Sequence, residues 1–235
     1  MADRGAPAGL VLFARRQTAG RGSRGRIFHS PDNGLYFSLL LRPNAHVSDA
    51  LSITTMAAVA VCHALAGFTQ EEPRIKWVND VYYRNRKISG ILTESVTDPD
   101  GNVSYLILGI GVDLVKPDGG FPPELEQIAG FVFDSPPDDE IYNCVAAKLL
   151  DELDHILFQA DPTATREEYR RLSFLIGREV TVREGESSYR AHVTGIGDDY
   201  ALLLRSEDGR TITLNSGDVS FSQWDGDKQI SLSRQ

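Results

Sequence analysis

Short apolar stretches separated by polar, glycine-rich segments run through the first 172 residues. Gly9–Ala14 predicts a buried strand, and Leu35–Leu41, with its alternating positions, predicts a second one. Ser48 is a residue type that caps helices, and apolar residues recur from there to Leu65 at helical spacing. The other predicted elements of this part are the strands Arg74–Trp77, Val81–Tyr83, Lys87–Glu94 and Val103–Leu114, and the helices Asp138–Phe158 and Thr163–Leu172.

Turn and loop signals separate these elements. Arg84-Asn85-Arg86 would join two strands as a hairpin, and Asp98–Asn102 (DPDGN) predicts a tight turn. Gln17–Asn33, rich in glycine, arginine and serine, predicts a loop. Val115–Pro137 contains five prolines and predicts a long surface connection.

The pattern changes at about residue 173. Five short strands follow, divided by turns rich in glycine and aspartate: Arg178–Arg183, Ser188–Gly195, Ala201–Arg205, Thr211–Leu214 and Val219–Phe221. Such spacing is typical of a small β-barrel. The sequence therefore predicts an α+β fold, with a mixed sheet and helices over residues 1–172 and a small all-β barrel over residues 173–235.

Composition narrows the class of protein. The chain has 235 residues, is 41% hydrophobic and 24% charged, and carries a net charge of −9, which argues against a general nucleic-acid binder. The first 45 residues nevertheless hold seven arginines against two aspartates, which favours a specific small anion as ligand. Two cysteines, scattered histidines, no run of 18 apolar residues and no apolar signal segment predict a cytoplasmic protein without a metal site.

The most informative segment is the glycine–arginine loop, residues 17–31 (QTAGRGSRGRIFHSP). Its glycines match G-x-G-x-x-G, but a helix follows that motif directly in dinucleotide-binding folds, and here Pro31, Gly34 and a predicted strand follow. The companion motifs of kinases and P-loop proteins are missing as well. With these motifs excluded, the loop still offers backbone N–H groups and three guanidinium groups, which can bind a phosphate or a carboxylate. A solvated surface loop or a nucleic-acid patch is the alternative.

Two further segments carry candidate chemistry. In Ile75–Glu94 (IKWVNDVYYRNRKISGILTE), Lys76 ends a buried strand, where an ammonium group needs an anionic partner. Gly90 in the same segment indicates close approach of a ligand or another backbone. Gly109–Asp113 places two glycines on a buried strand, which leaves room for a flat ligand or for tight packing.

Together, the three segments resemble the biotin protein ligases, whose pattern is Q-x-x-G-R-G-R-x-G-R-x-W, then K-W-P-N-D…K-x-x-G-[IV]-L-x-E, then G-[IV]-G-x-N. The matching residues, in the same order and spacing, are Gln17, Gly20, Arg21, Gly22, Gly25, Arg26, Lys76, Trp77, Asn79, Asp80, Lys87, Gly90, Ile91, Leu92, Glu94, Gly109 and Gly111. The resemblance covers residues 8–222, including the C-terminal barrel.

The resemblance implies an ATP-dependent ligase that forms biotinyl-5′-AMP and transfers biotin to a lysine of a biotin carboxyl carrier domain. Biotin and ATP would be its substrates, with Mg²⁺ accompanying ATP. The implied catalytic residues are Lys76, Arg21 and Arg26. The implied biotin-binding residues are Gln17, Gly20, Arg21, Gly22, Ser23, Lys76, Gly90 and Gly109. The implied nucleotide-binding residues are Arg24, Arg26, Phe28, Asn79, Asp80 and Asp113.

Four positions depart from the family pattern. Ser23 stands where the family has a loop arginine that shields the adenylate, so we expect biotinyl-AMP to escape and label nearby lysines. Phe28 replaces tryptophan, Val78 replaces proline, and Asp113 replaces an asparagine expected near the adenine. The Asp113 carboxylate would repel phosphate or accept a hydrogen bond from the adenine amino group.

The start of the chain is also short relative to the family. Only sixteen residues precede Gln17, so we expect the Ser-Thr-Asn helix that helps to hold biotin, and the DNA-binding domain of some relatives, to be missing. A lipoate or octanoate ligase and a non-catalytic, ligase-like binding module are the alternatives. The expected partners are a carrier domain and, by family analogy, a second copy of the chain, but neither nucleic acid nor a membrane.

Overall fold

The computed structural model describes residues 1–32, 34–47, 50–135, 139–184 and 187–221. By its internal contacts the chain divides into two compact units. The first comprises Met1–Phe174 together with Asp198–Tyr200, and the second comprises Leu175–Gly197 and Ala201–Gln235.

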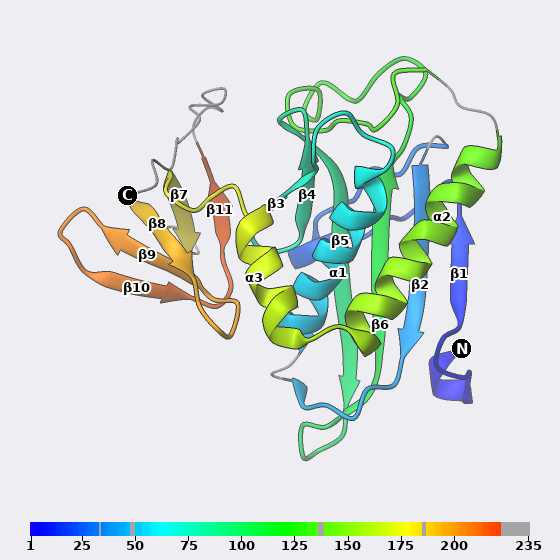
Figure 1. Ribbon diagram of the computed structural model, residues 1–235, viewed down its shortest axis with the longest axis horizontal. Coiled ribbons are helices and arrows are strands. Elements are labelled where there is room, and N and C mark those ends of the chain that lie inside the picture. Colours follow the sequence, from blue (N-terminus) through cyan, green and yellow to red (C-terminus); the bar gives the residue numbers. More distant parts are fainter. Residues whose placement is uncertain (33, 48–49, 136–138, 185–186, 222–235) are drawn as a thin grey trace. The chain divides into compact units, whose positions relative to one another are not determined.

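The first unit is built on a six-stranded sheet in the order β1-β2-β6-β5-β4-β3 (Figure 1). Its strands are β1 (Val11–Ala14), β2 (Gly34–Leu41), β3 (Arg74–Lys76), β4 (Asp80–Tyr83), β5 (Arg86–Thr97) and β6 (Val103–Asp113). Each predicted strand forms, with its ends shifted by a few residues. All ladders between these strands are antiparallel, so the sheet is not mixed. Short turns from β3 to β6 reverse the chain each time, which antiparallel neighbours require.

Strand position in the sheet decides burial. β2 lies between β1 and β6, and seven of its eight residues are buried, so its sequence is apolar almost throughout rather than alternating. β1 was expected to be buried, but Leu12 and Phe13 are 50% and 48% exposed. The reason is that β1 is an edge strand with a partner on one side only.

The α-helices described in this unit are α1 (Ala50–Ala66), α2 (Asp139–Asp154) and α3 (Pro162–Leu172). Figure 1 shows α1 and α2 running across one face of the sheet. The middle of α1, Ala57–Val61, is fully inaccessible, as expected of a helix that is apolar all round. The Asp161 side chain caps α3 by accepting hydrogen bonds from the first backbone N–H groups. Ser48 and Asp138, predicted to begin α1 and α2, lie outside the described residues.

Two predicted turns have the expected chemistry. Arg84 and Asn85 join β4 to β5 with φ angles of 47° and 64°, the left-handed backbone that two-residue hairpins need. The Asp98 carboxylate accepts hydrogen bonds from the backbone N–H groups of Asp100 and Asn102. The peptide bond between Trp77 and Val78 is cis.

The second unit is a five-stranded antiparallel sheet in the order β10-β9-β8-β7-β11. Its strands are β7 (Glu179–Glu184), β8 (Ser187–Ile196), β9 (Leu202–Ser206), β10 (Thr211–Leu214) and β11 (Asp218–Ser220). The predicted all-β character is confirmed. Among the described residues β10 and β11 do not pair, so the strands form an open sheet and not a closed barrel.

Within the described ranges, none of the helices combines the length and apolar character that crossing a membrane requires.

Candidate active site

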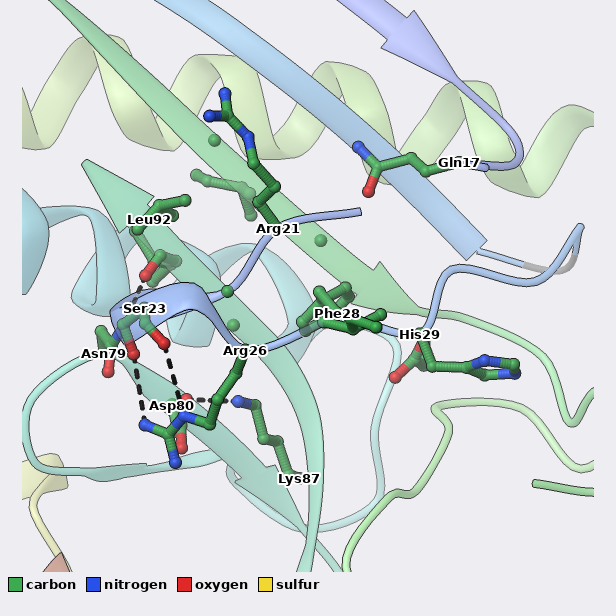
Figure 2. A pocket seen from close by; sticks show the side chains of 18 of the residues that line it. Gln17, Arg21, Ser23, Arg26, Phe28, His29, Asn79, Asp80, Lys87 and Leu92 are labelled. Carbon is green, nitrogen blue, oxygen red and sulfur yellow. Dashed lines mark hydrogen bonds and ion pairs between the residues drawn. The ribbon is translucent and has the colours of Figure 1, made fainter. Parts of the chain in front are cut away.

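A pocket of about 570 Å³ lies on the face of the sheet opposite the helices, beneath the glycine–arginine loop (Figure 2). That volume is in the usual range for small-molecule sites. Successive side chains of β5 point to opposite faces of the sheet, because a strand has a period of two residues. Leu92 and Glu94 line the pocket, whereas the Thr93 hydroxyl accepts a hydrogen bond from Thr54 of α1 at 2.7 Å.

Glycines on the two central strands make room in the pocket floor. Gly90 of β5 pairs with Gly111 of β6, and Phe28 from the loop lies over both. A Cβ on Gly111 would lie 2.6 Å from the Phe28 ring, and one on Gly90 would lie 2.9 Å from it. In this structure the group that approaches both glycines is the Phe28 side chain, which is tight packing at Gly111 and differs from the ligand or backbone expected at Gly90.

The glycine–arginine loop is closed at its base by hydrogen bonds. The Gln17 backbone N–H donates to the Ser30 carbonyl, and the Ser30 hydroxyl donates to the Gln17 side chain at 2.8 Å. The Phe28 N–H donates to the Gly20 carbonyl at 3.0 Å. A side chain on Gly20 would collide with Phe28, Ser30 and Gln17, so Gly20 shapes the loop from a buried position.

The cationic side chains of the pocket pair with groups of the protein itself. Arg21 Nη2 lies 3.0 Å from the Glu94 carboxylate, and both side chains are largely exposed. Lys87 Nζ lies 2.6 Å from Asp80, in a less exposed position. The Arg26 guanidinium donates to Ser23, a neutral partner within the loop. Arg21 and Lys87 thus have carboxylate partners that an anionic ligand would have to replace.

Asn79 and Asp80, predicted as ligand contacts, also organise the site. The Asn79 side chain donates to the Ile91 carbonyl at 2.6 Å, and the Ile91 N–H donates back to the Asn79 carbonyl. These bonds hold the turn before β4 against β5, beside Lys76 at the end of β3. Trp77 is directed elsewhere, with its indole N–H donating to the Tyr200 carbonyl.

Asp113 lies at the end of β6, lines the pocket and is only 7% exposed. Burial raises the pKa of its carboxyl group to about 7, although the Tyr36 hydroxyl and the positive charge of Lys87 oppose the rise. Tyr36 Oη is 3.3 Å from Asp113 Oδ1 and 3.1 Å from the Pro31 carbonyl. A buried carboxyl group with a raised pKa is an unusual lining for a pocket rich in cations.

The connection between β6 and α2 forms a wall of the pocket through Phe121, Leu125, Ile128 and Ala129. The Lys87 N–H donates to the Ile128 carbonyl, and the Gly130 N–H donates to the Lys87 carbonyl. The connection lies largely at the surface, as the sequence predicts, and it lines the pocket as well. The signal in the sequence that could have indicated this wall is the set of apolar residues between its prolines. The last two of those prolines, Pro136 and Pro137, lie outside the described residues.

Most residues implied by the resemblance meet in this pocket. Those lining it are Gln17, Arg21, Gly22, Ser23, Arg26, Phe28, Lys76, Asn79, Asp80, Gly90, Gly109 and Asp113. Gly20 lies in the loop base and does not line the pocket. Arg24 belongs to the short helix η2 (Ser23–Gly25), and the structure does not describe its side chain.

Comparison with known proteins identifies the family. Residues 3–113 match the model of the biotin/lipoate A/B protein ligase family, and residues 175–222 match the biotin protein ligase C-terminal domain. The biotin–[acetyl-CoA-carboxylase] ligase of Paracoccus denitrificans is 31% identical over 211 residues, which are 86% of this chain and 86% of that protein. The chain belongs to the biotin protein ligase family.

Other members of the ligase family give the same result. The bifunctional ligase/repressor BirA of Bacillus spizizenii is 30% identical over 218 residues, and the match covers 89% of this chain but 65% of that longer protein. Among solved structures, the Aquifex aeolicus biotin protein ligase in complex with biotin and ATP has a TM-score of 0.74 and 26% identity. The match covers 93% of this chain and 91% of the Aquifex chain.

Within this ligase family fold, the predicted set of site residues did not include Lys87, Glu94 or Tyr36. Lys87 and Glu94 were part of the sequence pattern but had no predicted role, and both line the pocket. Tyr36 carried no sequence signal beyond its place in an apolar strand. Its contact with Asp113 joins residues 77 positions apart, which only the pairing of β2 with β6 brings together.

Proposed function

We propose that this protein is an ATP-dependent biotin protein ligase, which activates biotin as biotinyl-5′-AMP and transfers it to a lysine of a biotin carboxyl carrier domain. The observation that carries the proposal is the convergence of four cationic side chains on one pocket with a glycine-lined floor: Arg21, Arg26, Lys76 and Lys87. The match of residues 175–222 to the biotin protein ligase C-terminal domain favours biotin over lipoate or octanoate.

The first step joins two anions and needs charge neutralisation more than a protein nucleophile. A carboxylate oxygen of biotin attacks the α-phosphorus of ATP, the bond to the β-phosphate breaks, and pyrophosphate leaves. Lys76 and Lys87 approach the floor from β3 and β5, and Arg21 and Arg26 approach from the loop. Cations on two sides suit a ligand whose carboxylate and phosphate meet between them.

In the second step the neutral amine of an acceptor lysine attacks the biotinyl carbonyl carbon. The amide bond forms, the bond to phosphate breaks, AMP leaves, and the amine nitrogen gives its remaining extra proton to solvent. The mixed anhydride must be kept from water until then. We assign that role to the glycine–arginine loop, because it covers the pocket and is closed at its base by the hydrogen bonds between Gln17 and Ser30.

Mg²⁺ would accompany ATP. This ion usually keeps several waters and binds through substrate phosphates plus one or two carboxylates. In the described part of the chain no three potential metal ligands cluster, but Asp80 is a pocket carboxylate beside Lys87. The donor set therefore fits an ion that arrives with the nucleotide, with Asp80 as its protein ligand. When bound, the ion would neutralise phosphate charge.

The remaining assignments follow from this activity. We propose residues 1–172 as the catalytic domain and residues 173–235 as a small accessory domain. We also propose a cytoplasmic location, since Cys62 and Cys144 are both free thiols.

The test is pyrophosphate release from Mg·ATP with biotin, with lipoate or with neither, followed by mass spectrometry of an added carrier domain. We expect release that requires biotin and a mass gain of biotin on the carrier domain. Release that requires lipoate would show that lipoate, and not biotin, is the substrate. No release with either acid, from protein with an intact circular dichroism spectrum, would favour the non-catalytic binding module.

A further inference from the structure

The Tyr36 hydroxyl lies between two hydrogen-bond acceptors. Its oxygen is 3.1 Å from the Pro31 carbonyl, at the end of the glycine–arginine loop, and 3.3 Å from Asp113 Oδ1, at the end of β6. A phenol has one proton to donate. With an ionised Asp113 the two acceptors share this one proton, whereas a neutral Asp113 can donate its own proton to the Tyr36 oxygen and leave the phenol proton entirely to Pro31.

The surrounding fold holds Tyr36 in this position. Its side chain is 1% exposed, and Gly34 faces Asp113 across the pairing of β2 with β6. A Cβ on Gly34 would overlap the Tyr36 hydroxyl, and one on Gly111 would lie 3.2 Å from the ring. Phe28 packs edge-on against the same ring. The hydroxyl therefore has little freedom to turn towards other partners.

We propose that Asp113, as a neutral acid, holds the Pro31 end of the glycine–arginine loop through Tyr36, which makes Tyr36 and Asp113 positioning residues for the ligase reaction. When Asp113 ionises, its carboxylate takes the Tyr36 proton in a charge-assisted hydrogen bond. The Pro31 carbonyl then loses this donor. The loop is held below the pKa of Asp113 and released above it.

The surroundings of the pair bring the titration of Asp113 close to physiological pH. Burial raises the pKa of Asp113 to about 7. Burial and the neighbouring Asp113 also raise the pKa of Tyr36, so the phenol keeps its proton. The other ionisable groups that act on the pair are Lys87, which favours ionised Asp113, and Asp32 and Tyr142, which favour neutral Tyr36. Lys87 is itself paired with Asp80.

The proposal rests on the proposed function for its consequence, but it can be tested on the full chain without any ligand. Infrared difference spectra between the wild type and Asp113→Asn report the C=O stretch of a protonated carboxyl group. We expect this band at about pH 6 and its loss by about pH 9. A band missing at the lower pH would show an ionised Asp113 and would overturn the proposal.

Hydrogen exchange then tests the coupling to the loop, through the Gln17 and Phe28 amides at its base. In the wild type we expect protection factors to fall by up to about tenfold per pH unit above the pKa of Asp113. In Asp113→Asn the amide N–H₂ donates to Tyr36 at every pH, so protection should stay high. In Tyr36→Phe protection should be low throughout. An equal pH dependence in the wild type and Asp113→Asn would contradict the proposal.

Activity separates this inference from the proposed function. We expect pyrophosphate release by the wild type to decline with rising pH as Asp113 ionises, and the decline to be absent in Asp113→Asn. A chain that shows the exchange behaviour but releases no pyrophosphate would retain the loop contact and lack the ligase activity. A chain that releases pyrophosphate with identical pH profiles in both proteins would retain the activity and lack the role of Asp113.

Discussion

Lys87 is held over the pocket floor by neighbours on three sides. Its ammonium lies 2.6 Å from the Asp80 carboxylate and 5.6 Å from the centre of the Phe28 ring. A Cβ on Gly90 would lie 3.2 Å from it, so the glycine gives the ammonium its space. The ion pair with Asp80 holds the ammonium in place, and an anion entering the pocket would replace that carboxylate as its partner.

We expect Lys87→Ala to lower the rate of biotin-dependent pyrophosphate release by about 10²–10³-fold, the usual loss for one group that stabilises developing charge. Lys76→Ala, whose role the sequence pattern predicts, should lose a similar factor. Lys148→Ala is the matched control, because that lysine pairs with Glu152 on α2. A near-normal rate in Lys87→Ala, with the control unchanged, would contradict the assigned role.

At the scale of the element, the glycine–arginine loop combines a fixed base with a short helical turn, η2, above the pocket. Ser23 begins that turn and accepts from Arg26 through its carbonyl and its hydroxyl. Position 23 lines the pocket. The serine side chain at this position is uncharged and too short to cover a bound ligand.

We expect Ser23→Arg to reduce the escape of biotinyl-AMP, since a guanidinium at this position would form a charge-assisted hydrogen bond to the phosphate. Labelling of bystander protein lysines should fall by about tenfold, which corresponds to one such bond. Mass spectrometry of a bystander protein measures it, and Ser23→Ala should label as the wild type does. Wild-type labelling confined to one carrier lysine would contradict the idea of a leaking intermediate.

At the scale of the whole molecule, an ion-pair network ties segments of the first unit that are distant in sequence. Arg171 of α3 binds Glu72 and Glu168, and Glu168 lies 2.9 Å from His63 of α1. Hydrogen bonds from Arg171 and His63 lower the pKa of Glu168 to about 2, against an ordinary value of 4.5. A lowered pKa means that Glu168 stabilises the fold while it is ionised. That contribution is present above about pH 4.5 and is lost as the pH falls towards 2.

We therefore expect Glu168→Gln to lower the urea midpoint of unfolding at about pH 7, and the difference from the wild type to shrink as the pH approaches about 2. Glu167→Gln is the control, because Glu167 is exposed and its ion pair with Arg170 lies at the surface. Equal effects of the two substitutions at neutral pH would show that the network adds no more than a surface ion pair.

The sequence by itself determined the elements and most of the pocket. Apolar periodicity placed the strands and helices to within a few residues, because local burial patterns follow strand and helix periods. Glycine and arginine spacing identified the loop, since backbone freedom and guanidinium chemistry are properties of single residues. The sequence did not predict how deeply each strand is buried. β1 pairs with one neighbour and is half exposed, although its sequence is as apolar as that of β2.

Only the tertiary structure decided which residues meet. Tyr36, Asp113 and Pro31 come together because β2 pairs with β6 in one register and the loop returns to the sheet beside them. The wall formed by Phe121 and Leu125 depends on hydrogen bonds between a proline-rich connection and β5. Burial, and with it the pKa of Asp113, is set by side chains that are distant in sequence, because desolvation depends on everything packed around a group and not on its neighbours in the chain.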